Sequence, residues 1–371
     1  MQKRLLAYST ALLMIMSGCS SHKDASSKSY TPALSSFSEE NIYTRNNKLV
    51  TNHVIQGFHI DSDGDVWFTQ VTREKLYLSK VNPNKTKQAN DNLQLSMLLT
   101  HFGHGTNTAI EEVGKDRYFW AGCYGTCNKS GQYWGEKLVG RVKVADGAVV
   151  PTDKCDEYFY IGEYTDMHPS IDADNDLLTI NYADNSNKDY RCFVVYNLSD
   201  AKKAPLKEVK IVCSDGFCTG NPASTKDTTV SVVAHDLTAL TPVGRPKFLK
   251  AGYGKPGDKY YFWQGFDVHK DRLYYAEGQD NKNLSGSYDK GNSYAYITVF
   301  DFDGNIVEER TQVSVISDKD ALTKAGISVY GLMESEGVKI YNGKIYLGFS
   351  SVGINAEEKT RHHNVFVWKG K

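Results

Sequence analysis

Two neighbouring segments decide the fold of this chain: Gln264-Gly-Phe-Asp-Val-His-Lys-Asp-Arg-Leu-Tyr-Tyr-Ala-Glu-Gly278 and Tyr294-Ala-Tyr-Ile-Thr-Val-Phe-Asp301. The first reads as a strand, a Lys-Asp turn and a second strand in which apolar and polar residues alternate. The second reads as a third strand that ends at the turn signal Asp301-Phe-Asp-Gly304. Together they predict the beginning of an antiparallel meander.

The same pattern recurs along the chain, and its copies begin at Gln56, Thr108, His168, Gln264 and Ser335. Each copy has a hairpin turned by Asp-Gly, Lys-Asp, Asn-Asp or Asn-Gly, then a loop and a strand of β-branched or aromatic residues. Repeated small antiparallel sheets that leave only short edges are typical of a β-propeller. The sequence therefore predicts an all-β protein, a propeller of five blades.

The spacing of the hairpins leaves an alternative open. Asn175 and Asp271, the turn residues of the third and fourth copies, are 96 residues apart, which is room for a sixth blade. We favour five blades with an elaborated third blade or third-to-fourth connection, because a further hairpin of the repeat type is missing there. The segment Ile42–His53 is expected to complete the final blade and close the ring, since an open sheet edge is a liability.

The first 40 residues are expected to lie outside the propeller, which would span 41–371. Residues 1–18 have the basic start and apolar run of a signal peptide. The ending Ser-Gly-Cys19 resembles a bacterial lipobox, which implies a lipidated (palmitate-bearing) Cys19 that anchors the chain in a bilayer. Residues 19–40 would be the anchor and a flexible tether, and Ser20 favours the bacterial outer membrane. A secreted protein without an anchor is the alternative.

Charge and cysteine content narrow the class of protein further. Removal of Lys3 and Arg4 with the signal changes the formal net charge from −1 to −3, and a basic stripe is lacking, which argues against a nucleic-acid partner. If Cys19 carries the lipid, six of the seven cysteines remain, and an even number in an exported chain suggests three disulfides. Local pairing predicts Cys123 with Cys127, Cys213 with Cys218, and Cys155 with Cys192, although fifteen pairings exist. A zinc site is the weaker interpretation of these cysteines.

Polar residues placed just before or within the innermost strands are the candidate ligand-binding residues, because innermost strands line a propeller's channel. These residues are Gln56, His59, His104, Asn107, His168 and Gln264. The alternative is that they only satisfy backbone groups and bridge blades.

A carboxylate pair would make the chain an enzyme of the glycoside hydrolase or lyase type. Asp267 and Glu334 come from neighbouring copies and are the candidate catalytic pair, since a glycosidase places two carboxyl groups on either side of one bond. We expect no metal cofactor. Asp61-Ser-Asp-Gly-Asp65 resembles the start of a calcium loop, but it lacks the Glu at position twelve and is better explained as a hairpin turn.

Three stretches carry a resemblance to a known group: His104-Gly105, Trp263-Gln-Gly-Phe266 and Leu273-Tyr-Tyr-Ala-Glu-Gly-Gln279. They are similar to stretches of the helveticin J and teichoic acid biosynthesis protein C group of secreted bacterial proteins, over roughly residues 50–368. The resemblance implies a propeller-like fold and an association with cell envelopes or bacteriocin-like activity. The lipobox and the six further cysteines depart from that group.

The sequence as a whole predicts an anchored envelope lipoprotein. Its propeller would bind an envelope glycan or a protein partner at the channel mouth. A glycan-cleaving enzyme and a structural scaffold in an envelope complex are the alternatives.

Overall fold

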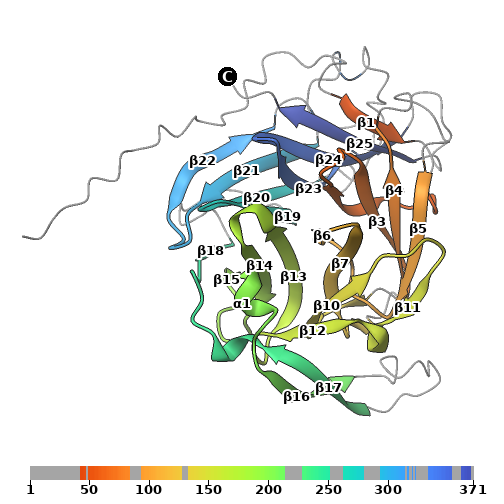
Figure 1. Ribbon diagram of the computed structural model, residues 1–371. Helices are drawn as coiled ribbons and strands as arrows, with labels where there is room; N and C mark the ends of the chain where they lie inside the picture. Colours follow the sequence, from red (N-terminus) through yellow and green to blue (C-terminus); the bar gives the residue numbers. More distant parts are fainter. Residues whose placement is uncertain are drawn as a thin grey trace, which may run out of the picture.

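The computed structural model describes residues 42–46, 49–83, 93–127, 133–213, 228–250, 262–279, 293–313, 316, 320, 322, 333–352 and 361–368. These residues form a ring of five blades around a central axis, so the protein is a five-bladed β-propeller (Figure 1). The predicted signal peptide, Cys19 and the tether lie outside the described residues.

Each blade is an antiparallel meander whose first strand lies next to the axis. Blade 1 contains β2 (Ile55–Ile60), β3 (Val66–Thr72), β4 (Lys75–Val81) and β5 (Leu93–Thr100). Blade 2 contains β6 (Ala109–Val113), β7 (Asp116–Cys123), β10 (Leu138–Lys143) and β12 (Glu157–Tyr160). Blade 3 contains β13 (Thr165–Asp172), β14 (Leu177–Ala183), β15 (Tyr190–Asn197) and β18 (Lys247–Leu249). Blade 4 contains β19 (Phe262–His269), β20 (Arg272–Gln279), β21 (Tyr294–Phe300) and β22 (Ile306–Gln312). Blade 5 contains β23 (Glu334–Tyr341), β24 (Lys344–Val352), β25 (Arg361–Trp368) and β1 (Ile42–Asn46).

The ring is closed by the N-terminal strand. β1 pairs antiparallel with β25, and Ile42 lies opposite Phe366. The predicted closure of the last blade by the segment that begins at Ile42 is therefore confirmed. This pairing joins residues from the two ends of the described chain, so the ring has no open seam.

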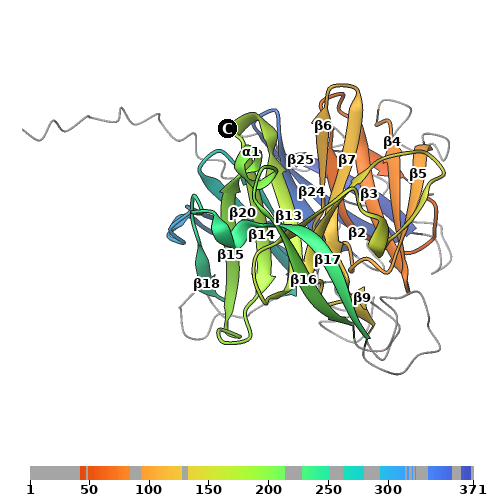
Figure 2. The ribbon, with the colours of Figure 1, turned by 60° about the horizontal axis from the view of Figure 1, so that its bottom comes forward.

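The long interval between the third and fourth hairpins holds an insertion in the third blade. The chain leaves blade 3 after β15 through the short helix α1 (Leu198–Ala201), forms the hairpin β16 (Leu206–Cys213) and β17 (Thr228–Asp236), and returns as β18. β17 pairs parallel with β12, so the hairpin extends the sheet of blade 2 outward (Figures 1 and 2). The expected elaboration of the third blade is confirmed, and its contact with blade 2 was not predicted.

The remaining elements are short. β11 (Val149–Pro151) pairs parallel with β5 of blade 1, and β8 (Thr126–Cys127) pairs with β9 (Tyr133–Trp134). Turns of 3-10 helix cover Thr152–Lys154, Ala173–Asn175 and Leu237–Ala239. Within the described residues, we find no helix with the length and apolar character needed to cross a bilayer.

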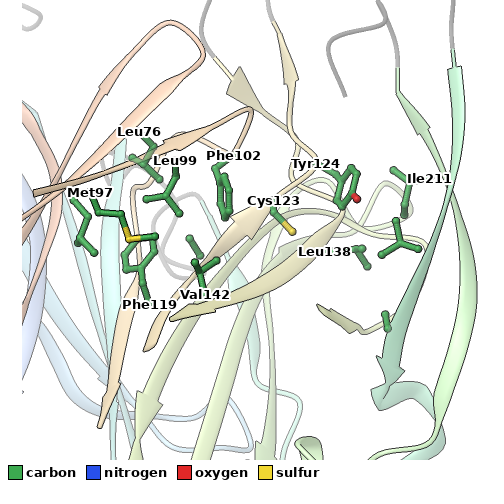
Figure 3. Close-up of a cluster of buried hydrophobic side chains, with 14 of the residues drawn as sticks. Leu76, Met97, Leu99, Phe102, Phe119, Cys123, Tyr124, Leu138, Val142 and Ile211 are labelled. Carbon is green, nitrogen blue, oxygen red and sulfur yellow. The ribbon is translucent and has the colours of Figure 1, made fainter. Parts of the chain in front are cut away.

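The core lies between the blades. Leu76 and Met97 of blade 1 pack with Phe119 and Val142 of blade 2, and Ile211 of the inserted hairpin extends the same cluster outward (Figure 3). Each of these side chains is at least nine-tenths buried. Burial of one such side chain stabilises the fold by about 2 kcal/mol. Alternating apolar residues on both faces of each blade therefore hold the blades together and fix the inner strands around the axis.

Candidate functional site

Backbone segments of neighbouring blades contact one another at one level of the channel, which we call the waist. The ladder between the first two strands of a blade shifts register at Ile55/Gly57, Thr165/His168, Trp263/Gly265 and Ser335/Val338. Gly265 and Gly337 have φ values of 127° and 115°, and a Cβ on Gly265 would lie 3.2 Å from the Cα of Gly337. A β-bulge with glycine lets two backbones meet there. The Gln-Gly-Phe sequence thus marks the waist.

Asn107 connects three blades at this waist. Its Nδ2 donates to the carbonyl oxygen of Pro169 at 2.7 Å, and its Oδ1 accepts from the backbone N–H of Phe266 at 3.0 Å. Asn107 is buried, and both ends of its amide are used. These contacts are those of the alternative stated from the sequence, in which Asn107 bridges blades, and ligand binding by Asn107 stays a prediction.

The waist divides the axis into a start mouth, where the inner strands begin, and a turn mouth, where they end at their hairpin turns. Gln56, His168 and Gln264 directly precede the waist residues in the chain and so belong to the start mouth, together with His104. His59 and Asp267 follow the waist and line the turn mouth. The structure therefore separates the predicted ligand-binding residues into two groups rather than one.

Histidine rings at the start mouth are paired with tryptophan rings. His104 stacks on Trp134 with ring centroids 3.8 Å apart, and His168 lies 4.7 Å from Trp263. Burial lowers the pKa of His104 to about 4. Burial, together with the charge of Arg191, lowers the pKa of His168 to about 3. Both imidazoles are therefore neutral above pH 5, because the buried site disfavours the charged ring.

Glu136 is a buried acid that sequence reasoning missed. Its side chain lies against Gly103 and Gly122, where a Cβ on either glycine would clash with it, and it is fully buried. Its Oε1 accepts from the backbone N–H of His104 at 2.8 Å. Burial, with a smaller contribution from Asp166, raises the pKa of Glu136 to about 8. Only Gly103 and Gly122, which make room for the Glu136 side chain, could have indicated its position, and both are distant from Glu136 in the sequence.

A cavity of about 400 Å³ opens at the turn mouth. All five inner strands or their hairpin turns contribute to its wall. The lining residues are His59, Ile60, Ser62, Ile110, Glu112, Ile171, Asp172, Ala173, Asp174, Asp267, Val268, His269, Lys339, Ile340, Tyr341 and Asn342. This volume lies within the range of pockets for small ligands.

Asp267 is fixed in the cavity wall by partners from two other blades. Its Oδ1 accepts from the hydroxyl of Ser170 at 2.6 Å and lies 3.0 Å from the ammonium of Lys339, while its Oδ2 accepts from the backbone N–H of Ile340. Burial, with the charge of Lys339, lowers the pKa of the neighbouring His59 to about 3. The Nδ1 atom of His59 has no hydrogen-bond partner among the described residues. A ligand in the cavity could supply one.

The predicted catalytic pair is not brought together. Asp267 contacts Lys339 and Ile340 near the end of β23, whereas Glu334 is the first residue of that strand. Lys339 lies five positions after Glu334 on this strand, and five steps of a strand span about 16 Å. A glycosidase pair needs a separation of roughly 5–10 Å. The sequence could not show this, because it places residues on strands but not at a height along the channel.

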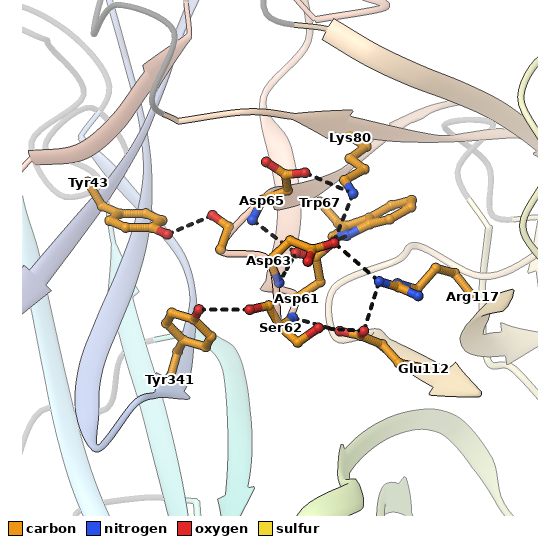
Figure 4. Close-up of polar contacts among 11 residues, drawn as sticks. Tyr43, Asp61, Ser62, Asp63, Asp65, Trp67, Lys80, Glu112, Arg117 and Tyr341 are labelled. Carbon is orange, nitrogen blue, oxygen red and sulfur yellow. Dashed lines mark hydrogen bonds and ion pairs between the residues drawn. The ribbon is translucent and has the colours of Figure 1, made fainter. Parts of the chain in front are cut away.

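Other acids at the turn mouth also hold partners. Glu112 accepts from the backbone N–H and the hydroxyl of Ser62, both at 2.6 Å, and lies 2.9 Å from Arg117 (Figure 4). Burial alone would raise the pKa of Asp172. The hydrogen bonds from His269, the Lys270 N–H and Asn175 outweigh this effect and lower that pKa. These contacts orient the carboxylates around the cavity.

The Asp61 turn beside the cavity contains its own cation. The ammonium of Lys80 lies 3.0 Å from Asp61 Oδ2 and 2.9 Å from Asp65 Oδ2, and Asp61 Oδ1 accepts from the N–H of Asp63 and Asp65 (Figure 4). These carboxylates therefore serve an internal ion pair in a hairpin turn. No group of three or more potential metal-ligating side chains occurs among the described residues.

The predicted disulfide pattern requires correction. Cys123, Cys155 and Cys192 are free, so the predicted bonds of Cys123 with Cys127 and of Cys155 with Cys192 are absent. The thiols of Cys123 and Cys155 instead meet over Gly140, whose Cβ would lie 3.2 Å and 2.6 Å from their sulfur atoms. Cys213 is disulfide-bonded, while Cys218 lies outside the described residues. Spacing along the chain did not reveal which cysteines share a sheet.

The fold and the axial cavity define this chain as a five-bladed propeller with a polar pocket at its turn mouth. It is similar to the tail fiber of Staphylococcus aureus phage P68, with a TM-score of 0.54 and 15% sequence identity, over 89% of this chain and 52% of that chain. The chain thus spans about half the length of the tail fiber. This likeness shows the fold alone.

Two further solved structures are less similar to this chain. The polysaccharide lyase Uly1 has a TM-score of 0.35 and 10% identity, over 87% of this chain and 91% of that chain. The GH43 protein BlXynB (K247S mutant) from Bacillus licheniformis has a TM-score of 0.33 and 11% identity, over 85% and 53%. No protein-family model and no curated protein matches the chain. The resemblance to the helveticin J group therefore stays a prediction.

Proposed function

We propose that this protein is an envelope lipoprotein whose propeller binds a saccharide of the cell envelope in the turn-mouth cavity. The observation that carries the proposal is that all five blades contribute to one cavity of about 400 Å³ that presents both hydrogen-bond donors and acceptors. Sugar hydroxyl groups need both kinds of partner, and such polar groups give a pocket its specificity.

The lining chemistry supports a saccharide over a purely apolar ligand. Glu112 and Asp174 offer carboxylate acceptors, Lys339 offers an ammonium donor, and Tyr341 offers an aromatic ring next to them. Ile110 is among the apolar side chains beside these polar groups, and it would contact the C–H faces of a sugar ring. A small set of placed polar groups on an apolar wall is the usual composition of a ligand site.

The state of the carboxylates favours binding over hydrolysis. A glycosidase acid has a raised pKa so that it is protonated when it meets the substrate. In the cavity wall, Asp267 and Glu112 form ion pairs, and the pKa of Asp172 is lowered. Among the described residues, burial raises the pKa of Glu136, and Glu136 does not line the cavity.

The anchor is the part of the proposal that rests on the sequence. Met1–Met16 and Ser-Gly-Cys19 support export and lipidation, and Ser20 supports the outer membrane. Lipidation at Cys19 would hold the propeller at the envelope, where its ligand is most concentrated. Metabolic labelling with a palmitate analogue tests this part: incorporation that is lost in Cys19→Ala supports it, and no incorporation contradicts it.

A glycan array and envelope polysaccharides, probed with the full chain, test the binding function, with product analysis of every hit. Binding of an intact saccharide is the expected result. Asp174→Asn should weaken it, because Asp174 is an exposed carboxylate of the cavity wall, whereas Asp153→Asn, an acid outside the wall, should not. Cleavage of the ligand would overturn the proposal in favour of an enzyme, and absence of any saccharide binding would favour a protein partner.

A further inference from the structure

Among the described residues, the inserted hairpin leaves one edge of β16 without a paired strand. β16 is the last strand in the six-stranded sheet of blade 2, and among the described residues only β17 pairs with it. Its inward side chains, Val209 and Ile211, are buried in the core that blades 1 and 2 share. Its outward face exposes Leu206 to 65% and Val212 to 49%. An unpaired strand edge with exposed apolar residues is a template for another strand.

The backbone of β16 has its free hydrogen-bonding groups on the even-numbered residues. The N–H of Asp236 donates to the carbonyl oxygen of Pro205 at 2.8 Å, so Pro205 faces β17. Successive residues of a strand direct their N–H and C=O groups to alternate sides. Leu206, Glu208, Lys210 and Val212 therefore direct theirs away from the sheet, to where a second strand would lie.

The outward face of β16 is complementary to the same face of a second, antiparallel β16. Leu206 and Val212 are apolar and lie at its ends, and Glu208 and Lys210 are opposite charges and lie between them. We propose that β16 pairs antiparallel with β16 of a second copy of this chain, about a two-fold axis at Val209. Glu208 then lies opposite Lys210 of the other copy, and Leu206 lies opposite Val212, twice each by symmetry.

Charge selects this register over its neighbours. Pairing centred on Glu208 would place two glutamates opposite each other, and pairing centred on Lys210 would place two lysines opposite each other. Like charges in directly opposed positions destabilise an antiparallel pair, whereas opposite charges and apolar pairs stabilise it. The register centred on Val209 alone combines outward-facing backbone groups with two ion pairs. The dimer joins the sheets of two blades and leaves both turn-mouth cavities outside the contact, since no β16 residue lines the cavity.

Sedimentation velocity of the full chain in mild detergent, over a series of concentrations, tests this dimer. The wild-type protein should show a monomer–dimer equilibrium. Lys210→Glu places glutamates opposite glutamates and should weaken the dimer by about tenfold or more. Glu208→Lys should weaken it equally by placing lysines opposite lysines. An equal mixture of these two variants should dimerise again, and so should the double variant Glu208→Lys/Lys210→Glu.

Lys344→Glu is the matched control, because Lys344 is an exposed strand residue of blade 5. It should leave the dimer unchanged. Circular dichroism and thermal melting of each variant check that the propeller is folded, and recovery in the mixture is a result that a misfolded variant would not give. A wild-type chain that is monomeric at every concentration, or a dimer that ignores both charge reversals, would overturn the proposal.

Discussion

The carboxylate of Asp267 and the ammonium of Lys339 meet at 3.0 Å across the boundary between blades 4 and 5, in the wall of the axial cavity. Their side chains are 8% and 6% exposed, so water contributes little to the solvation of either charge. The same carboxylate accepts from Ser170 of blade 3. One acid therefore connects three blades at the site where we place the ligand.

Asp267→Asn should destabilise the propeller by about 3 kcal/mol or more, because it leaves the ammonium of Lys339 buried without its counter-charge. The double variant Asp267→Asn/Lys339→Met removes both charges and should recover most of that loss. Chemical denaturation of the three proteins measures this. Equal losses in the single and double variants would show that the contact has no such energetic role.

Gly265→Ala should destabilise the protein by about 2–4 kcal/mol, because alanine strains a φ of 127° and its Cβ would lie 3.1 Å from Asn107 Oδ1 and 3.2 Å from Gly337 Cα. Gly114→Ala is the control: Gly114 also has a positive φ, of 59°, but nothing within 4 Å. Its cost should be about 1 kcal/mol. Thermal melting compares the two, and similar losses would argue against close backbone packing at the waist.

Glu136→Gln should change how stability depends on pH. The pKa of Glu136 rises from 4.5 unfolded to about 8 folded, so its neutral form stabilises the fold below pH 4.5 and this contribution is lost as pH rises through 8. Relative to the Gln variant, the wild-type protein should lose stability over this window by up to about 1.4 kcal/mol per pH unit. Urea denaturation at a series of pH values measures the difference. Parallel pH profiles would contradict the raised pKa.

The fold was predictable because its signals are local. Turn residues such as Asp63–Gly64 and Asn342–Gly343 lie between short alternating strands, and they recur in all five blades. The final blade's closure followed from the need to pair an edge. The inserted hairpin could not be assigned to blade 2, because the parallel pairing of Phe159 with His235 joins segments that no local pattern connects.

The site was predictable only in part, for a reason of geometry. The sequence identifies which residues lie on inner strands, and two of the predicted residues, His59 and Asp267, line the cavity. It does not show that the backbones of Gly265 and Gly337 meet at the waist, or that His104 and His168 lie on the other side of it from the cavity. The disulfide prediction was wrong for a similar reason, because the contacts of the cysteines depend on which strands are neighbours in space.

The most direct test of the account is an equilibrium titration of the saccharide that binds best, by calorimetry, against variants of the two mouths. Asp174→Asn at the turn mouth should weaken binding by about tenfold, which is 1.4 kcal/mol. Trp134→Ala at the start mouth should leave affinity unchanged, because Trp134 stacks on His104 on the other side of the waist. Loss of binding in Trp134→Ala with full binding in Asp174→Asn would contradict the turn-mouth site.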